Sequence, residues 1–181
     1  VIDNLSNSKL EVKDKIEKIT GKKLKVYIED VCNEESLDKI MTENNITDVI
    51  HFAGYKAVGE SVAKPIMYYE NNLLSTISLL KQMKKHHVKN IIFSSSATVY
   101  GQPEKLPITE DSKVGGTTNP YGTTKLMIEQ ILSDVYKSDN EMNITILRYF
   151  NPVGGHVSGL LGESPNGIPN NLMPYIVRVA V

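Results

Sequence analysis

The feature that most constrains the fold is the regular alternation of short apolar runs with longer amphipathic stretches. Four runs rich in β-branched or apolar residues are predicted to be buried strands, over residues 23–30, 48–54, 90–96 and 143–150. Apolar residues recur at spacings of three and four in three other stretches, which predicts helices over residues 33–45, 66–87 and 121–138. Strands that alternate with helices pair in parallel through right-handed crossovers. The sequence therefore predicts an α/β fold, a Rossmann-like doubly wound parallel sheet in three layers.

Both ends of the sequence indicate that this fold is incomplete. The opening "VIDNLSNS" is an apolar pair that runs into Asp3 and Asn4, which is typical of the end of a strand whose start is absent. The closing "LMPYIVRVAV" stops inside a predicted helix. A complete doubly wound domain carries a strand, a glycine-rich turn and a helix ahead of this point. We therefore expect a fragment that lacks the first strand and helix.

Charge and composition argue against several classes of protein. The 20 Lys and Arg residues balance 21 Asp and Glu residues, so there is no general attraction to nucleic acid or to an anionic membrane. Cys32 is the single cysteine, which excludes a disulfide framework and a cysteine-rich zinc site and favours a reducing compartment. No apolar run approaches the roughly 18 residues of a membrane span, and no signal-peptide pattern is present. We expect a soluble, cytoplasmic protein with no nucleic-acid, membrane or metal partner.

The stretch "NPYGTTKLMIEQIL" places Tyr121 and Lys125 four residues apart at the head of a predicted helix. With Pro120 in the first turn, the two side chains share one face and are free to converge. A neighbouring ammonium favours the phenolate and lowers the phenol pKa of about 10 by roughly 1–3 units. The pair is suited to move a proton, although a lone pair at this spacing is more often a half-buried aromatic and a solvated cation.

The stretch "SSSATVYG" follows a predicted buried strand, so its hydroxyls emerge at the sheet edge where ligands collect. Ser96 is suited to hydrogen-bond a substrate hydroxyl, and the next strand-to-helix connection is able to bring it to Tyr121. Because the serine has no histidine or acid partner in the sequence pattern, acyl transfer is disfavoured. Ser96, Tyr121 and Lys125 together predict proton transfer from an alcohol.

Small and polar residues also follow the other predicted strands. Ala53 and Gly54 let the backbone approach a flat or charged ligand, and Lys56 can reach a phosphate or ribose oxygen. A carboxylate at Asp3 can accept both hydroxyls of an adenosine ribose and would repel a 2′-phosphate. An Asp-Asn pair also simply forms turns, and Asp30 fits the N-cap region of the following helix equally well.

Seven segments carry a family resemblance that covers essentially the whole chain. They are "DNL", "VIHFAGYKAVGESVAKP", "YYENN", "SSSATVYG", "PYGTTKLMIEQIL", "LRYFNPVGGH" and "GIPNNLMPYI". In this order and spacing the chain resembles the extended short-chain dehydrogenase/reductases and, within them, the UDP-glucose 4-epimerase family. The resemblance implies an isomerase of galactose metabolism that interconverts UDP-glucose and UDP-galactose. It implies NAD-dependent 4-epimerisation through a 4-keto intermediate.

The resemblance also implies a role for each matching position. The catalytic trio would be Ser96, Tyr121 and Lys125. The residues implied to bind NAD are Asp3, Asn4, Asp30, Val31, Phe52, Ala53, Gly54, Lys56, Asn71 and Phe150. The residues implied to contact the UDP-sugar substrate are Ser96, Tyr121, Asn151, Asn171 and Leu172. Residues 1–150 would form an NAD-binding domain, incomplete at its N-terminus, and residues 151–181 would begin the substrate-binding region. A homodimer through helices over 67–83 and 125–137 is implied as well.

Other functions stay open at this point. A sugar-nucleotide 4,6-dehydratase shares the fold, the cofactor and the tyrosine, but it needs an added acid and base to expel water. The resemblance places an Asp-Glu pair there in dehydratases, whereas this chain has Ala97 and Thr98. A 4-reductase would need an exchangeable cofactor, which the sequence discriminates poorly. A non-catalytic dinucleotide-binding module, or an inactive fragment of one, is the alternative from a different class, and the intact trio argues against it.

Overall fold

The computed structural model describes residues 1–163 and 171–180, apart from the side chain of residue 178. The chain divides into two compact units, which are described separately below. One unit comprises residues 31–150, and the other comprises residues 1–30 together with the described residues from 151 onward. The two-domain assignment expected from the resemblance stays a prediction.

The unit of residues 31–150 is built on a three-stranded parallel sheet of order β1-β2-β3. Its strands are β1 (Asp48–His51), β2 (Asn90–Ser96) and β3 (Asn143–Tyr149). Its helices are α2 (Glu34–Glu43), α3 (Val58–Ala63), α4 (Pro65–Lys85) and α5 (Pro120–Ser138), with the 3-10 helix η1 (Ala97–Tyr100). The predicted α/β class with a parallel sheet is confirmed, and the three predicted helices lie within a few residues of their expected bounds.

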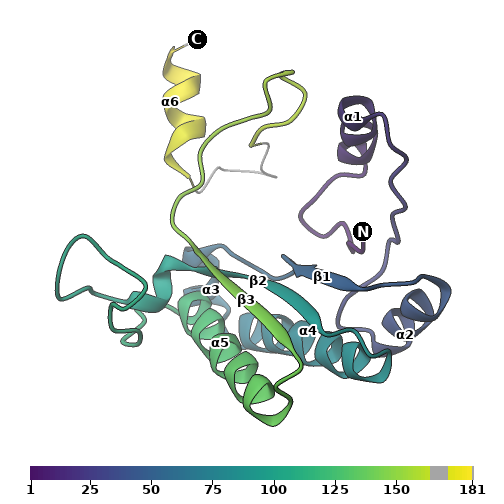
Figure 1. The fold of residues 1–181 in the computed structure, drawn as a ribbon. Coiled ribbons are helices and arrows are strands. Elements are labelled where there is room, and N and C mark those ends of the chain that lie inside the picture. The colour runs from purple at the N-terminus through teal and green to yellow at the C-terminus, as the bar shows by residue number, and fades with distance from the viewer. Residues whose placement is uncertain (164–170, 181) are drawn as a thin grey trace. The chain divides into compact units, whose positions relative to one another are not determined.

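Helices α3, α4 and α5 lie on the same face of this sheet (Figure 1). The core of the unit fills the space between these helices and the sheet, because alternate residues of β2 point toward the helices. Ile91 and Phe93 of β2 are buried there with Tyr68 of α4 and Leu132 of α5. Within residues 31–150 the other face of the sheet carries exposed apolar side chains such as Leu147.

The start of α5 is fixed by local capping. Pro120 occupies the first turn, where its missing N–H costs nothing, and the side chain of Asn119 accepts a hydrogen bond from the Gly122 amide at 2.8 Å. These two residues set the position of Tyr121 at the head of the helix.

The other unit contains α1 (Glu11–Thr20) and α6 (Leu172–Ala180). The strand predicted over residues 23–30 is wrong, because that segment forms only one parallel bridge, from Tyr27 to Ile2. The chain turns at Leu5, which has a positive φ of 56° and whose amide donates to the Asp3 carboxylate. No helix among the described residues is long and apolar enough to cross a membrane.

Candidate active site

Ser96 ends β2 and caps the 3-10 helix that follows it. Its Oγ accepts hydrogen bonds from the amide of Thr98 at 3.3 Å and from the hydroxyl of Thr98 at 3.0 Å. The 3-10 helix ends at Gly101, which has a φ of +58°. A Cβ at this position would lie 2.5 Å from the Gly116 carbonyl oxygen, so only glycine fits. The amide of Gly115 also donates to the Val99 carbonyl at 2.8 Å, which closes the base of the loop that follows Gly101.

Lys125 is a buried cation, with 5% of its surface exposed. Its Nζ donates to the Ser94 carbonyl at 2.7 Å and lies 4.8 Å from the ring centre of Phe93 and 5.8 Å from that of Tyr121. In the part of the chain that the structure describes, no carboxylate lies within 4.0 Å of this ammonium. Burial lowers the pKa of Lys125 to about 8. An ammonium has three donors, so this one retains donors for a ligand.

The pKa of the Tyr121 phenol differs from what the sequence predicts. Burial raises the pKa of its phenol above the ordinary 10, and a hydrogen bond from Ser96 acts in the opposite direction. The lowering that we expected from Lys125 is not found in the protein alone, because the ammonium is directed at the Ser94 carbonyl instead. The phenol is therefore protonated near neutral pH until another positive charge arrives.

Apolar rings are exposed at the carboxyl edge of the sheet. Phe52 follows β1 and Phe150 follows β3, with 62% and 60% of their surfaces exposed. The rings of Phe52 and Tyr149 are 6.5 Å apart, and Tyr149 pairs in register with Ser96. Ala53 is exposed beside them. Large rings at this edge of a parallel sheet are suited to contact a flat ligand.

The loop after β1 is fastened by the buried side chain of Asn72, which sequence reasoning missed. Its Oδ1 accepts from the Tyr55 amide at 2.8 Å, and its Nδ2 donates to the Tyr55 carbonyl at 3.0 Å and to the Thr124 hydroxyl at 3.1 Å. Asn71, a predicted cofactor residue, donates to the same Oδ1 at 2.9 Å. Gly54 has a φ of +146°, and a Cβ there would lie 3.1 Å from Asn72. The loop and helix α5 are thus held together at one point.

The remaining predicted positions of the 31–150 unit are Lys56, which is exposed, and Val31, which is half-buried. The others belong to the second unit. Asp3 accepts hydrogen bonds from the Leu5 amide and the Ser8 hydroxyl, both at 2.7 Å, which makes it a turn former. The side chain of Asn4 donates to Asp30 at 2.9 Å. Their predicted ligand roles stay predictions.

Three predicted substrate residues also belong to the second unit. They are Asn151, Asn171 and Leu172, and Asn171 donates to Glu163 at 2.6 Å. Their roles stay predictions as well. The first four residues of the "GIPNNLMPYI" motif, 167–170, lie outside the described residues.

A buried ion pair lies one helical turn beyond Lys125. Glu129, 7% exposed, accepts from Nε and Nη2 of Arg148 at 3.0 and 2.8 Å and from the Ser95 hydroxyl at 2.5 Å. Arg148 also donates to the Tyr100 hydroxyl at 3.0 Å. Sequence reasoning missed this network, which joins α5, β2 and β3.

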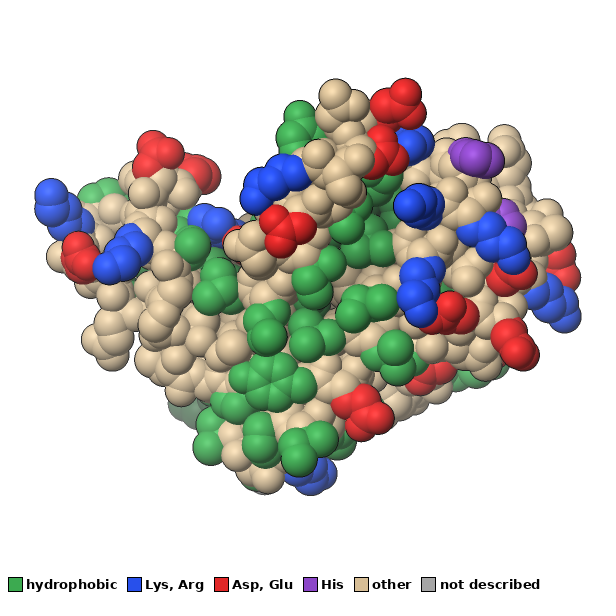
Figure 2. Space-filling model, turned by 90° about the horizontal axis from the view of Figure 1, so that it is seen from below, with side chains coloured by type: hydrophobic (Ala, Val, Ile, Leu, Met, Phe, Trp, Pro, Cys, Tyr) green, Lys and Arg blue, Asp and Glu red, His purple; other side chains and the backbone are tan. Residues whose placement is uncertain are grey.

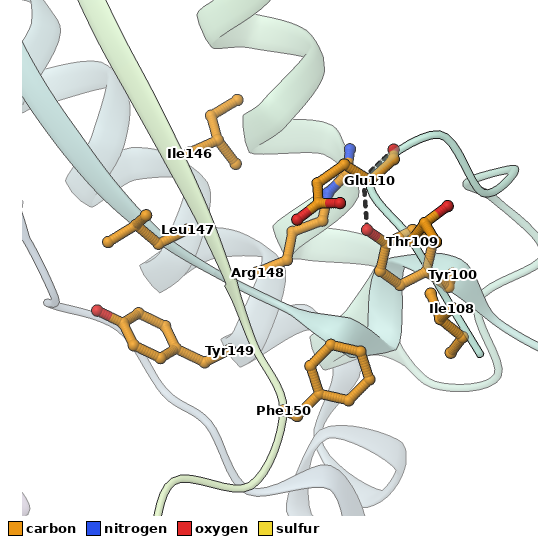
Figure 3. Close-up of a pocket in the computed structure, with 9 residues that line it drawn as sticks. All are labelled: Tyr100, Ile108, Thr109, Glu110, Ile146, Leu147, Arg148, Tyr149 and Phe150. Atoms are coloured by element: carbon orange, nitrogen blue, oxygen red, sulfur yellow. Dashed lines mark hydrogen bonds between the residues drawn. The ribbon is translucent and has the colours of Figure 1, made fainter.

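Arg148 and Tyr100 line a pocket of about 450 Å³ beside β3 (Figure 3). The other residues of its wall come from β3, from the segment that follows it and from the loop at residues 108–110: Ile108, Thr109, Glu110, Ile146, Leu147, Tyr149 and Phe150. The pocket lies along the strand at the edge of the described sheet. Among the described residues, no group of three or more His, Cys, Asp or Glu side chains is placed to hold a metal ion.

Comparison with known proteins places this geometry in a family. The whole chain, residues 1–181, matches the model of the NAD dependent epimerase/dehydratase family. It is 60% identical to the UDP-glucose 4-epimerase of Pasteurella multocida (strain Pm70) and 59% identical to that of Bacillus subtilis (strain 168), over 181 residues in each case. All of this chain is covered, but only 54% and 53% of those proteins.

Solved structures agree with the sequence matches. The UDP-glucose 4-epimerase of Bifidobacterium longum, crystallised with NAD⁺ and UDP, superposes with a TM-score of 0.96 at 62% identity. That match covers 99% of this chain and 53% of the other. The chain thus spans about half the length of the curated relatives it matches. Family model, curated relatives and solved structures agree that this chain belongs to the NAD dependent epimerase/dehydratase family.

Proposed function

We propose that this chain carries the catalytic trio of a UDP-glucose 4-epimerase, which interconverts UDP-glucose and UDP-galactose with NAD as cofactor through a 4-keto sugar. The observation that carries the proposal is the convergence of Ser96, Tyr121 and Lys125 at the carboxyl edge of the parallel sheet. Among the described residues, no carboxylate or histidine is hydrogen-bonded to the serine. The relatives named above, at 59–60% identity, support the same reaction.

The residues present fit the cofactor. Lys125 is a buried ammonium with a single protein hydrogen bond and no carboxylate partner among the described residues, and its remaining donors suit the paired hydroxyls of a ribose. The exposed rings of Phe52 and Phe150 would contact the flat parts of the dinucleotide. Its charged part would lie against the backbone of Gly54, together with Lys56 and Asn71. When bound, NAD supplies reversible hydride acceptance and, in its oxidised form, a positive charge.

The proton transfer is assigned to Tyr121. Its phenol oxygen would take the proton of the sugar 4-hydroxyl and return it after the ketone has presented its other face. Because burial raises the pKa of this phenol, ionisation depends on positive charge nearby. Since Lys125 does not lower this pKa in the protein alone, that charge would come from the oxidised cofactor, beside which Lys125 would lie. Ser96 would donate a hydrogen bond to the oxygen whose charge changes.

The test uses the full-length protein with UDP-galactose and no added NADH. We expect UDP-glucose to form, and we expect Tyr121→Phe to lower the rate by about 10³-fold because the general base is lost. The matched control is Tyr136→Phe, which changes an exposed tyrosine on the same helix and should leave the rate unchanged. A 4-keto-6-deoxy product, or no conversion by the unmodified protein, would refute the proposal.

We also infer a homodimer that uses α4 and α5. Apolar side chains are exposed on both helices: Ile66, Leu74 and Ile77 on α4, and Met127 on α5. Figure 2 shows apolar side chains gathered on the face seen from below, where these helices lie in Figure 1. Leu74→Glu with Ile77→Glu should convert a dimer to a monomer in light scattering, and a monomeric unmodified protein would contradict the inference. The proposed substrates and the single cysteine support a cytoplasmic enzyme of galactose metabolism.

A further inference from the structure

The hydrogen-bonding capacity of Ser96 is almost fully used by one neighbour. Its Oγ accepts from both the amide and the hydroxyl of Thr98, at 3.3 and 3.0 Å. A serine hydroxyl has two acceptor lone pairs and one donor proton. With both acceptor positions occupied, Ser96 has only its proton left, so toward any third group it is a donor.

The direction of that proton agrees with the contacts of Tyr121. A hydrogen bond from Ser96 acts on the Tyr121 phenol and opposes the effect of burial on its pKa. A bond that favours the ionised form of a phenol is one in which the phenol oxygen accepts. A serine free to rotate would also accept from the phenol or from the sugar alcohol, which would stabilise the neutral ground state instead.

Thr98 also contacts the helix that carries Tyr121. A Cβ built on Gly122 would lie 3.2 Å from both the Cβ and the Oγ1 of Thr98. The threonine side chain therefore packs directly against the backbone of the first turn of α5, at the residue next to Tyr121. One side chain thus touches both Ser96 and the helix start.

We propose that Thr98 is a positioning residue for the C4 chemistry, and that it holds the Ser96 hydroxyl as an obligate donor, to the Tyr121 oxygen in the protein alone and to the reacting sugar oxygen when substrate is bound. This inference rests on the proposed function. The sugar oxygen gains negative charge as its proton leaves, and a preoriented donor stabilises that change without reorganising.

The test compares Thr98→Val with Thr98→Ser in the full-length protein. Valine keeps the branched shape that packs against Gly122 and loses the hydroxyl, whereas serine keeps the hydroxyl. For Thr98→Val we expect kcat for UDP-galactose to fall about tenfold, with KM within about twofold. Ser96 is then no longer held as a donor, which weakens stabilisation of the transition state and leaves substrate binding nearly unchanged. The kcat of Thr98→Ser should lie within about threefold of that of the unmodified protein. Thr42→Val, on α2, is the matched control and should change neither constant.

A second readout does not depend on turnover. The phenol pKa of Tyr121 can be titrated from the absorbance difference between each variant and the same variant carrying Tyr121→Phe. Thr98→Val should raise this pKa by about half a unit or more, since Ser96 is then free to accept from the phenol. Thr98→Ala, which also lacks the hydroxyl and relieves the packing, should give the same rise.

The outcomes separate this inference from the proposed function. If the unmodified protein epimerises and Thr98→Val retains its kcat, the role of Thr98 is refuted and the function stands. A Thr98→Ser variant as slow as Thr98→Val, or a change in KM alone, also refutes it. If the unmodified protein does not epimerise, the proposed function fails, and an unchanged Tyr121 pKa in Thr98→Val would show that the hydrogen-bond assignment fails independently.

Discussion

Two buried charges lie on successive turns of α5, and only one of them has a counter-ion among the described residues. Glu129 is paired with Arg148 and also accepts from Ser95, so its charge and its lone pairs are satisfied by the protein. Lys125, one turn earlier, has one carbonyl partner and no carboxylate within 4.0 Å among the described residues. A buried charge without a counter-ion costs stability, so its presence indicates a use other than holding the fold. The comparison separates the turn of the helix whose charge is paired within the fold from the turn to which we assign a role in the proposed chemistry.

The largest expected effect comes from removing the unpaired charge. Lys125→Met should lower kcat by about 10³-fold, because a buried ammonium suited to hold the cofactor beside Tyr121 is lost. The free energy of unfolding should stay equal or rise, because methionine needs no hydration. Steady-state kinetics and urea unfolding of the full-length protein check both halves. A strongly destabilised Lys125→Met protein would show that the comparison is wrong.

The same charge gives a pH dependence of stability. Burial lowers the pKa of Lys125 from 10.5 to about 8, so between these values the unfolded chain binds a proton that the folded chain does not. The stability that this lysine costs is therefore recovered as the pH rises from about 8 to 10.5, by a total on the order of 3 kcal/mol. Unfolding of the nucleotide-free protein, measured relative to Lys125→Met, should show this rise. Parallel curves for the two proteins would exclude it.

Breaking the paired charge should act on stability. Glu129→Gln leaves the Arg148 guanidinium without its counter-charge and should lower the free energy of unfolding by about 2–3 kcal/mol. This expected loss of stability is smaller than the loss for fully buried ion pairs, because 23% of the Arg148 side chain is exposed. Adding Arg148→Met to Glu129→Gln should recover part of the loss. No recovery in thermal unfolding of the double variant would mean that the pair acts through packing alone.

The smallest effect is expected at the edge of the ion pair. Ser95→Ala removes one hydrogen bond to Glu129 and leaves Arg148 paired, which should cost about 1 kcal/mol of stability and change kcat less than threefold. Ser61→Ala is the matched control, since the hydroxyl of that buried serine donates to the Val58 carbonyl of its own helix. A large loss of kcat in Ser95→Ala would show that this network contributes to the reaction and not only to stability.

Sequence reasoning predicted that Ser96, Tyr121 and Lys125 lie close together because they belong to local patterns, and their catalytic role stays a prediction. Tyr121 and Lys125 are a helix-spaced pair, and Ser96 ends an apolar run, so their meeting follows from the parallel sheet. Glu129 was not found because a glutamate four residues after Lys125 looks like any solvated helix residue until its partner on β3 is known.

The errors have the same origin in tertiary structure. The pattern of residues 23–30 suits a strand, but in the structure the segment forms only the bridge from Tyr27 to Ile2. The pKa of Tyr121 was predicted to fall because the nearby cation is visible in the sequence, whereas the extent of burial is not. Helix α1 was missed although Val12, Ile16 and Ile19 have helical spacing.

The closed base of the loop after Gly101 limits how far changes within the loop extend. The bond from the Gly115 amide to the Val99 carbonyl and the close approach of Gly116 to Gly101 tie the two ends of residues 102–114 together beside the 3-10 helix that Ser96 caps. Because both ends are fixed, we expect substitutions at exposed positions of this stretch to leave the position of Ser96 unchanged. The pocket beside β3 is the exception, since residues 108–110 form part of its wall.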